Sequence, residues 1–160
     1  MDVIVNADDL GATAKVNDAI FDLIDQGRVT SATMLANSPW IEAACQRTGD
    51  YRYCSFGAHL NITEFRPLSN HEGLSPILNE SGEFAGQDRT RGTVIDQSLA
   101  KGIHAEFCAQ LERLITLGVP VSHIDSHHHV HTIPKMFPVL KKVQKQFNIR
   151  GIRISKNIYG

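Results

Sequence analysis

Residues 3–24 read VIVNADDLGATAKVNDAIFDLI, and two apolar patterns with different spacing follow one another within this stretch. The first is the continuous run 3–5, which is consistent with a short buried parallel strand. The second predicts an amphipathic helix that ends near Gly27, because apolar residues recur every three or four positions. Those positions are Val16, Ala19, Ile20, Leu23 and Ile24. A strand followed directly by a helix is the beginning of a βα unit.

The same alternation continues along the chain. Ser38 and Pro39 are a suitable N-cap and first residue for a second helix. Further strands are expected over 30–36, 55–60, 121–125 and 152–154, and further helices over 95–115 and after Pro134. Such alternation implies an α/β fold with a parallel sheet, either open and doubly wound or a (β/α) barrel. In both architectures, ligands bind at the carboxyl ends of the strands.

Composition limits the function classes. A length of 160 residues suits a single domain, residues 1–160, and a net charge of −1 gives no electrostatic case for nucleic acid or a membrane surface as partner. No apolar run approaches the roughly 20 residues that span a bilayer, and the N-terminus does not resemble a signal peptide. Cys45, Cys54 and Cys108 form no CxxC pair. We therefore expect reduced thiols in a cytoplasmic protein.

A long polar segment, residues 61–92, interrupts the alternation. It contains Pro67, Gly73, Pro76, Gly82 and Gly86. A connection of this length inside a compact domain usually forms a lid or a binding loop. We expect a long active-site loop here that governs the choice of substrate.

Polar residues follow three of the expected strands. Asn6, Asp8 and Asp9 come after the first, His59 ends the third, and a histidine-rich run, HIDSHHHVH, occupies residues 123–131. Because parallel strands end at one edge of a sheet, these groups should lie together.

The two adjacent carboxylates allow two interpretations. In an extended segment, neighbouring side chains point to opposite sides, so one carboxylate could bind an ion while the other faces a bound water. Alternatively, one of them caps the following helix.

The histidine run is a more specific signal. If extended, it would place His123, Asp125, His127, His129 and His131 on one face. Imidazole is the commonest protein metal ligand, and Asp125 could fix a histidine tautomer from outside the ligand set. His71, in the long segment, and His104, in a helix, lack such support and are expected to be non-ligands.

One carboxylate and two imidazoles would leave open positions on a divalent ion, which is the pattern of a catalytic site. Water bound to such an ion is acidic, and a second carboxylate beside it could accept the proton. The sequence therefore predicts metal-assisted hydrolysis of a carbonyl compound.

Four segments resemble the YdjC-like carbohydrate (chitooligosaccharide) deacetylases. They are IVNADDLG (residues 4–11), RVTSAT (28–33), GAHL (57–60) and HIDSHHHVHTIP (123–134), and they occur in the family's order. The resemblance implies a distorted (β/α) TIM-like barrel, here with about the first five strands. It also implies removal of N-acetyl groups from amino sugars.

The resemblance assigns roles by position. Asp9, His59 and His127 would bind Mg²⁺ or Zn²⁺, and Asp8 would be the general base. His129 and His131 would line the site or support the ligands from behind. Asn6 and Asp125 are further candidates to support the ligands or contact the substrate. The ion would polarise the acetyl carbonyl and bind the attacking water.

The chain departs from the family in length. Family members run to about 250 residues, as whole barrels do, and carry a later histidine thought to act as the acid. This chain ends at Gly160 without it. We expect a fragment, a short natural product or a site completed by another chain. The unpaired strand edge of an incomplete barrel favours a homo-oligomer. The alternatives are another barrel-type metal hydrolase, such as a phosphoesterase, or an inactive metal-binding remnant.

Overall fold

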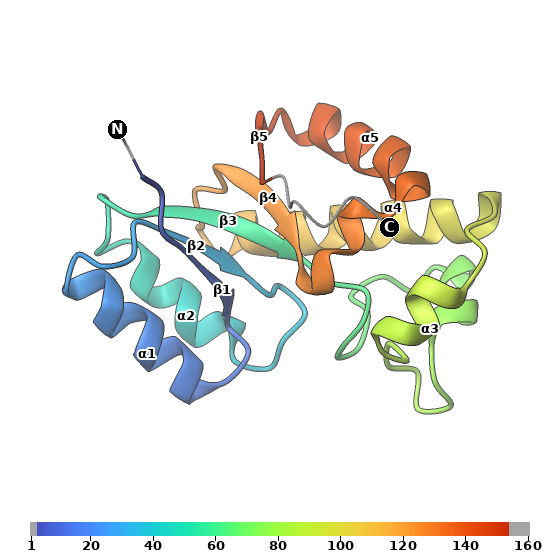
Figure 1. Ribbon diagram of the computed structural model, residues 1–160. Coiled ribbons are helices and arrows are strands. Elements are labelled where there is room, and N and C mark those ends of the chain that lie inside the picture. Colours follow the sequence, from blue (N-terminus) through green and yellow to red (C-terminus); the bar gives the residue numbers. More distant parts are fainter. Residues whose placement is uncertain (1–2, 154–160) are drawn as a thin grey trace.

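The computed structural model describes residues 3–153, and these form one parallel sheet with helical connections (Figure 1). The five strands are β1 Asn6–Leu10, β2 Ser31–Met34, β3 Ser55–Leu60, β4 His123–Ser126 and β5 Gly151–Ile152. The α-helices are α1 Ala14–Asp25, α2 Ile41–Thr48, α3 Gln87–Gly92, α4 Gln97–Thr116 and α5 Phe137–Phe147. Three 3₁₀ segments are η1 Glu72–Ile77, η2 His127–Thr132 and η3 Pro134–Met136.

The strand order decides between the two predicted architectures. The strands are hydrogen-bonded in the order β1-β2-β3-β4-β5, and every neighbouring pair is parallel. A doubly wound sheet would reverse its strand order at a switch point, whereas a barrel adds strands in sequence. The fold is therefore the α/β arrangement of the first part of a (β/α) barrel, and the described strands do not close it.

Helices cover one face of this sheet. Figure 1 shows α1 and α2 beside the β1–β2 edge, while α4 passes behind the sheet and packs against α5. Phe21, Phe56, Phe107 and Ile124 are among the core residues with 1% exposure or less. This packing fixes the strand ends that carry the polar clusters.

Two local predictions were wrong. The first strand is Asn6–Leu10 and not residues 3–5; the Val3 and Ile4 side chains are 63% and 79% exposed, because no described element covers them at the open sheet edge. Ser38 does not cap α2, whose N-cap is Trp40. Instead, the Ser38 hydroxyl donates to the carbonyls of Gly11 and Leu35 at 2.6 and 2.9 Å, tying the end of β1 to the end of β2.

The other predicted elements agree within a few residues. The predicted strand over 55–60 has the observed bounds, and the helix predicted over 95–115 is α4. Of the strand predicted over 152–154, residue 154 lies outside the described residues. No helix in residues 3–153 combines the length and apolar character needed to cross a membrane.

The segment over 61–92 carries local structure of its own, namely η1, α3 and a bridge between Leu78 and Phe84. Glu106 of α4 anchors it. This carboxylate is fully buried and accepts hydrogen bonds from the backbone N–H groups of Leu68 and Ser69 at 3.1 and 2.8 Å.

Candidate metal centre

Three strand ends bring one carboxylate and two imidazoles together. Oδ1 of Asp9 lies 2.8 Å from Nδ1 of His127 and 3.2 Å from Nε2 of His59. The three residues are separated by 50 and 68 positions in sequence, yet their ligand atoms all lie within 4.8 Å of one another. The group predicted as the ligand set is thus adjacent in the structure.

A bulge in β1 positions the two carboxylates. The register between β1 and β2 shifts between Ala7 and Leu10, and Asp9 adopts a left-handed backbone with φ of 66°. The prediction that Asp8 and Asp9 lie in an extended segment was therefore wrong at Asp9. The bulge changes the direction of the chain, and both carboxylates have an oxygen near the His59 ring. Asp9 lies in a donor group with His59 and His127, and Asp8 in one with His59 and Asp125. The helix-cap alternative was also wrong, since Thr13 caps α1.

Asp125 holds His59 from the side opposite Asp9. Nδ1 of His59 lies 2.5 Å from Oδ1 of Asp125, and both side chains are buried. Oδ2 of Asp125 accepts from the Thr33 hydroxyl at 3.1 Å and lies 3.0 Å from Nη2 of Arg153. A proton on Nδ1 leaves the Nε2 lone pair facing Asp9, which suits a metal ligand.

Arg153 also pairs with Asp8. Its two terminal nitrogens lie 2.6 and 2.8 Å from the two carboxylate oxygens, a bidentate arrangement. Asn6 donates from Nδ2 to Oδ1 of Asp8 at 2.7 Å and accepts from Ser31 at 2.6 Å. The predicted proton acceptor is therefore oriented from two sides.

The histidine run is not one extended face. β4 ends at Ser126, and His128 and His129 have left-handed backbones with φ of 51° and 52°. The prediction that alternate residues from 123 to 131 share a face was wrong beyond Ser126, because the chain turns there. The turn carries His127 back toward Asp9.

The remaining predicted residues lie around this centre. His129 lines the cavity above it, and His131 is buried with Nδ1 2.5 Å from the Ser126 hydroxyl. His123 is the first residue of β4, and its Nε2 lies 3.3 Å from the Ser31 hydroxyl oxygen. His71 caps η1, and neither it nor His104 belongs to a potential metal group among residues 3–153.

Sequence reasoning missed four residues of the site: Thr33, Glu64, Arg91 and Arg153. Oε2 of Glu64 lies 3.4 Å from Nε2 of His127, and Arg91 donates to the carbonyl of His128 at 2.8 Å. Glu64 and Arg91 come from the segment over 61–92, where no local pattern marked them. Arg153 lies within the strand predicted over 152–154, and its position in the sequence gave no sign of its pairing with Asp8 and Asp125.

A cavity of about 370 Å³ opens onto the candidate centre. It is lined by Asp8, Asp9, His59, Gln87, Arg91, Ser126, His127, His128 and His129. α3 supplies Gln87 and Arg91, so the predicted active-site segment contributes to the wall. This space lies at the strand ends and is accessible to a ligand from outside.

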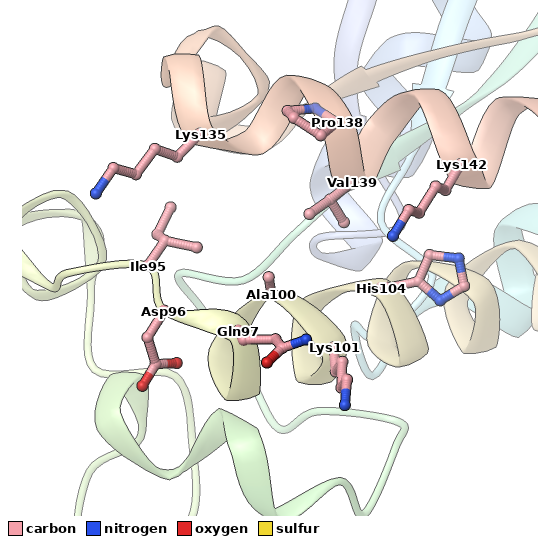
Figure 2. A pocket seen from close by; sticks show the side chains of 10 residues that line it. All are labelled: Ile95, Asp96, Gln97, Ala100, Lys101, His104, Lys135, Pro138, Val139 and Lys142. Atoms are coloured by element: carbon pink, nitrogen blue, oxygen red, sulfur yellow. The ribbon is translucent and has the colours of Figure 1, made fainter.

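A second cavity, of about 540 Å³, lies between α4 and α5 (Figure 2). Lys135 of η3 and Lys142 of α5 extend toward it, while His104 projects from α4. Its one lining acid, Asp96, is the N-cap of α4 and accepts from the Leu99 N–H at 2.8 Å. This cavity is larger than the one at the strand ends, but it is not the better catalytic candidate, because none of its lining residues belongs to a potential metal group.

The ionisation of the site follows from its pairing. Hydrogen bonds from His127 and His59 hold the pKa of Asp9 far below its usual range. Burial opposes a charge on His59, but the hydrogen bonds to Asp125 and Asp9 outweigh it and raise the pKa to about 9. Burial likewise opposes a charge on Asp8, and Arg153 lowers its pKa nonetheless.

The residues fit a divalent cation. Oδ1 of Asp9 is buried, and Nδ1 of His127 and Nε2 of His59 face it at 2.8 and 3.2 Å. An acidic oxygen and two ring nitrogens that face one another repel through their lone pairs unless a proton or a cation lies between them. One carboxylate and two imidazoles leave open positions for water and substrate.

A family model described as YdjC-like protein matches residues 2–159, so the chain belongs to the YdjC-like family. A carbohydrate deacetylase from Geobacillus stearothermophilus is 39% identical over 96% of this chain and 60% of its own length. Another, from Vibrio campbellii, is 35% identical over 93% of this chain and 57% of its own length.

A solved structure supports the same relationship. The crystal structure of a candidate cellobiose-phosphate cleavage protein from Enterococcus faecalis V583 matches with a TM-score of 0.86 and 29% identity. The match covers 97% of this chain and 59% of that protein. The chain therefore spans roughly three fifths of the length of these relatives.

Proposed function

We propose that this chain carries the metal-binding half of a carbohydrate deacetylase, which removes N-acetyl groups from amino sugars such as chitooligosaccharides. The observation that carries the proposal is the convergence of Asp9, His59 and His127 at the strand ends, with Asp8 beside them. The names of the curated relatives support the reaction class, and the cavity of about 370 Å³ at the strand ends supports an external substrate.

The protein's own groups have distinct tasks in this reaction. A divalent cation held by Asp9, His59 and His127 would supply an acidic water and polarise the acetyl carbonyl. Asp8 accepts the proton of the attacking water, and Arg153 keeps its carboxylate ionised and oriented. Asn6 would support Asp8 through its 2.7 Å hydrogen bond, while His129 and His131 would lie near the substrate or behind the ligands.

The donor set favours zinc over magnesium. Imidazole nitrogens suit Zn²⁺, whereas Mg²⁺ prefers oxygen ligands, and a single carboxylate is compatible with either ion. We therefore propose Zn²⁺ as the tighter ligand and Mg²⁺ as the alternative.

Acetate release from diacetylchitobiose tests the proposal. The metal-free chain is loaded with Zn²⁺ or Mg²⁺, and Asp9→Asn is compared with Asp22→Asn, which changes an exposed aspartate on α1. We expect metal-dependent acetate release that Asp9→Asn abolishes and the control retains. Phosphate release from phosphorylated substrates would favour a phosphoesterase, and metal binding with no turnover would favour a non-enzymatic remnant.

We also propose self-association and a cytoplasmic location. β1 and β5 are edges of the open sheet, and Val3 and Ile4 are exposed beside β1. Light scattering after size exclusion should give a mass above the 17.7 kDa of one chain. The location rests on buried, unpaired cysteines, which suit a reducing compartment.

A further inference from the structure

Glu64 lies on the side of His127 that faces away from Asp9. Its Oε2 is 3.4 Å from Nε2 of His127, while Nδ1 of the same ring lies 2.8 Å from Asp9. That Nε2 atom is buried and has no hydrogen-bond partner in the described part of the chain. The ring therefore directs one nitrogen to the proposed metal centre and the other to Glu64.

The neighbouring imidazole shows what such a carboxylate can do. Nδ1 of His59 contacts Asp125, and its Nε2 faces Asp9. A carboxylate that accepts the outer N–H of a histidine fixes the tautomer and leaves the inner lone pair free for a metal. His59 and His127 thus each have a carboxylate on the ring nitrogen that points away from Asp9.

The backbone of Glu64 is held firmly. Oδ1 of the fully buried Asn61 accepts from the N–H groups of Thr63 and Glu64 at 2.9 and 3.1 Å. The Glu64 carbonyl accepts from Asn61 at 2.8 Å and from Asn37 at 3.0 Å. The chain after β3 therefore has a fixed path, while the half-exposed Glu64 side chain can still close the last few tenths of an ångström to His127.

We propose that Glu64 is a positioning residue for His127: it accepts the Nε2–H and so selects the tautomer whose Nδ1 can hold the cation. The inference rests on the metal centre put forward above. Glu64 also forms a second possible donor group with His127 and His128. If that group bound an ion directly, Glu64 would be a ligand and the protein would take up two ions.

Zinc titration calorimetry of the metal-free chain separates these roles. Glu64→Ala and Glu64→Gln are compared with Glu80→Gln, an exposed glutamate in the same 61–92 segment. Loss of such a carboxylate weakens metal binding about 10- to 100-fold. We expect that loss in Glu64→Ala, a smaller one in Glu64→Gln, unchanged affinity in the control, and one zinc per chain throughout. Unchanged circular dichroism and melting temperature would show that all variants are folded.

Imidazole ¹H–¹⁵N spectra of the zinc-loaded protein detect the His127 Nε2–H directly. A purely structural role of Glu64 would leave this signal unchanged. The Nε2–H of His127 should be visible and slow to exchange in the wild type, and exchange quickly in Glu64→Ala. Unchanged zinc affinity and an unchanged Nε2–H signal would overturn the role of Glu64. A second zinc that disappears in Glu64→Ala would also overturn it, because Glu64 would then be a ligand. A wild-type chain that binds no zinc would instead refute the metal centre.

Discussion

Raising the pH should destabilise the metal-free protein through His59. Its pKa of about 9 lies above the ordinary value of about 6.5, because the hydrogen bonds to Asp125 and Asp9 outweigh the effect of burial. The folded state therefore holds this proton more tightly than the unfolded state. The resulting stability is fully present below pH 6.5 and is lost as the pH rises through 9.

The size of the effect follows from the two pKa values. Proton linkage gives about 3 kcal/mol of stabilisation at pH 6.5 and about 1 kcal/mol at pH 8.5, a loss of about 2 kcal/mol. Above pH 9 the buried thiols of Cys45, Cys54 and Cys108 also contribute, since burial raises their pKa to about 11. Between pH 6.5 and 8.5, the loss of unfolding free energy therefore comes mainly from the His59 imidazole.

Urea denaturation in EDTA measures this loss. The free energy of unfolding is determined at intervals of half a pH unit for the wild type, His59→Gln and the control His104→Gln. The ring of His104 lies in the cavity between α4 and α5 (Figure 2). The wild type and the control should lose about 2 kcal/mol across the interval, and His59→Gln should lose much less. Parallel curves for the wild type and His59→Gln would show that His59 does not cause the loss of stability.

Three further predictions concern other parts of the site. Asp8→Asn should keep zinc affinity within a few-fold and lower the rate of acetate release about 10²- to 10⁴-fold, which separates proton acceptance from metal binding; equal losses of both would contradict it. Arg153→Met should cost about 3 kcal/mol in urea denaturation, because it leaves the buried Asp125 and half-buried Asp8 without their cation, whereas exposed Arg52→Met should be nearly neutral. When free metal is present at 100 times its dissociation constant, removing it with a chelator should lower the free energy of unfolding by about 2.7 kcal/mol. Differential scanning fluorimetry should show this as a lower melting temperature in the wild type and no change in Asp9→Asn.

The sequence predicted the parts of the site that depend on strand ends. The three polar clusters could be expected together because apolar runs indicated the strands and parallel strands end at one edge, whereas the resemblance to the YdjC-like family singled out Asp9, His59 and His127 within those clusters. The sequential strand order then placed these ends side by side. The apolar pattern and the polar residues after it thus predicted where the clusters lie, but not which residue of each cluster binds the ion.

Backbone geometry and long-range pairing were beyond the same reasoning. The left-handed residues Asp9, His128 and His129 re-aim their side chains, and alternation rules assume an extended chain that they do not have. Arg153 reaches Asp8 across 145 positions, and Glu64 reaches His127 from a segment with no regular pattern. Such contacts depend on where the folded chain passes, so no local motif reveals them.

Anomalous X-ray scattering from a zinc-loaded crystal, recorded on both sides of the zinc absorption edge, shows whether Asp9, His59 and His127 bind the same cation. We expect one strong peak per chain, bonded to Oδ1 of Asp9, Nε2 of His59 and Nδ1 of His127. A peak at Glu64 and His128 without Asp9, or no peak at the strand ends of a protein that binds zinc elsewhere, would contradict this expectation.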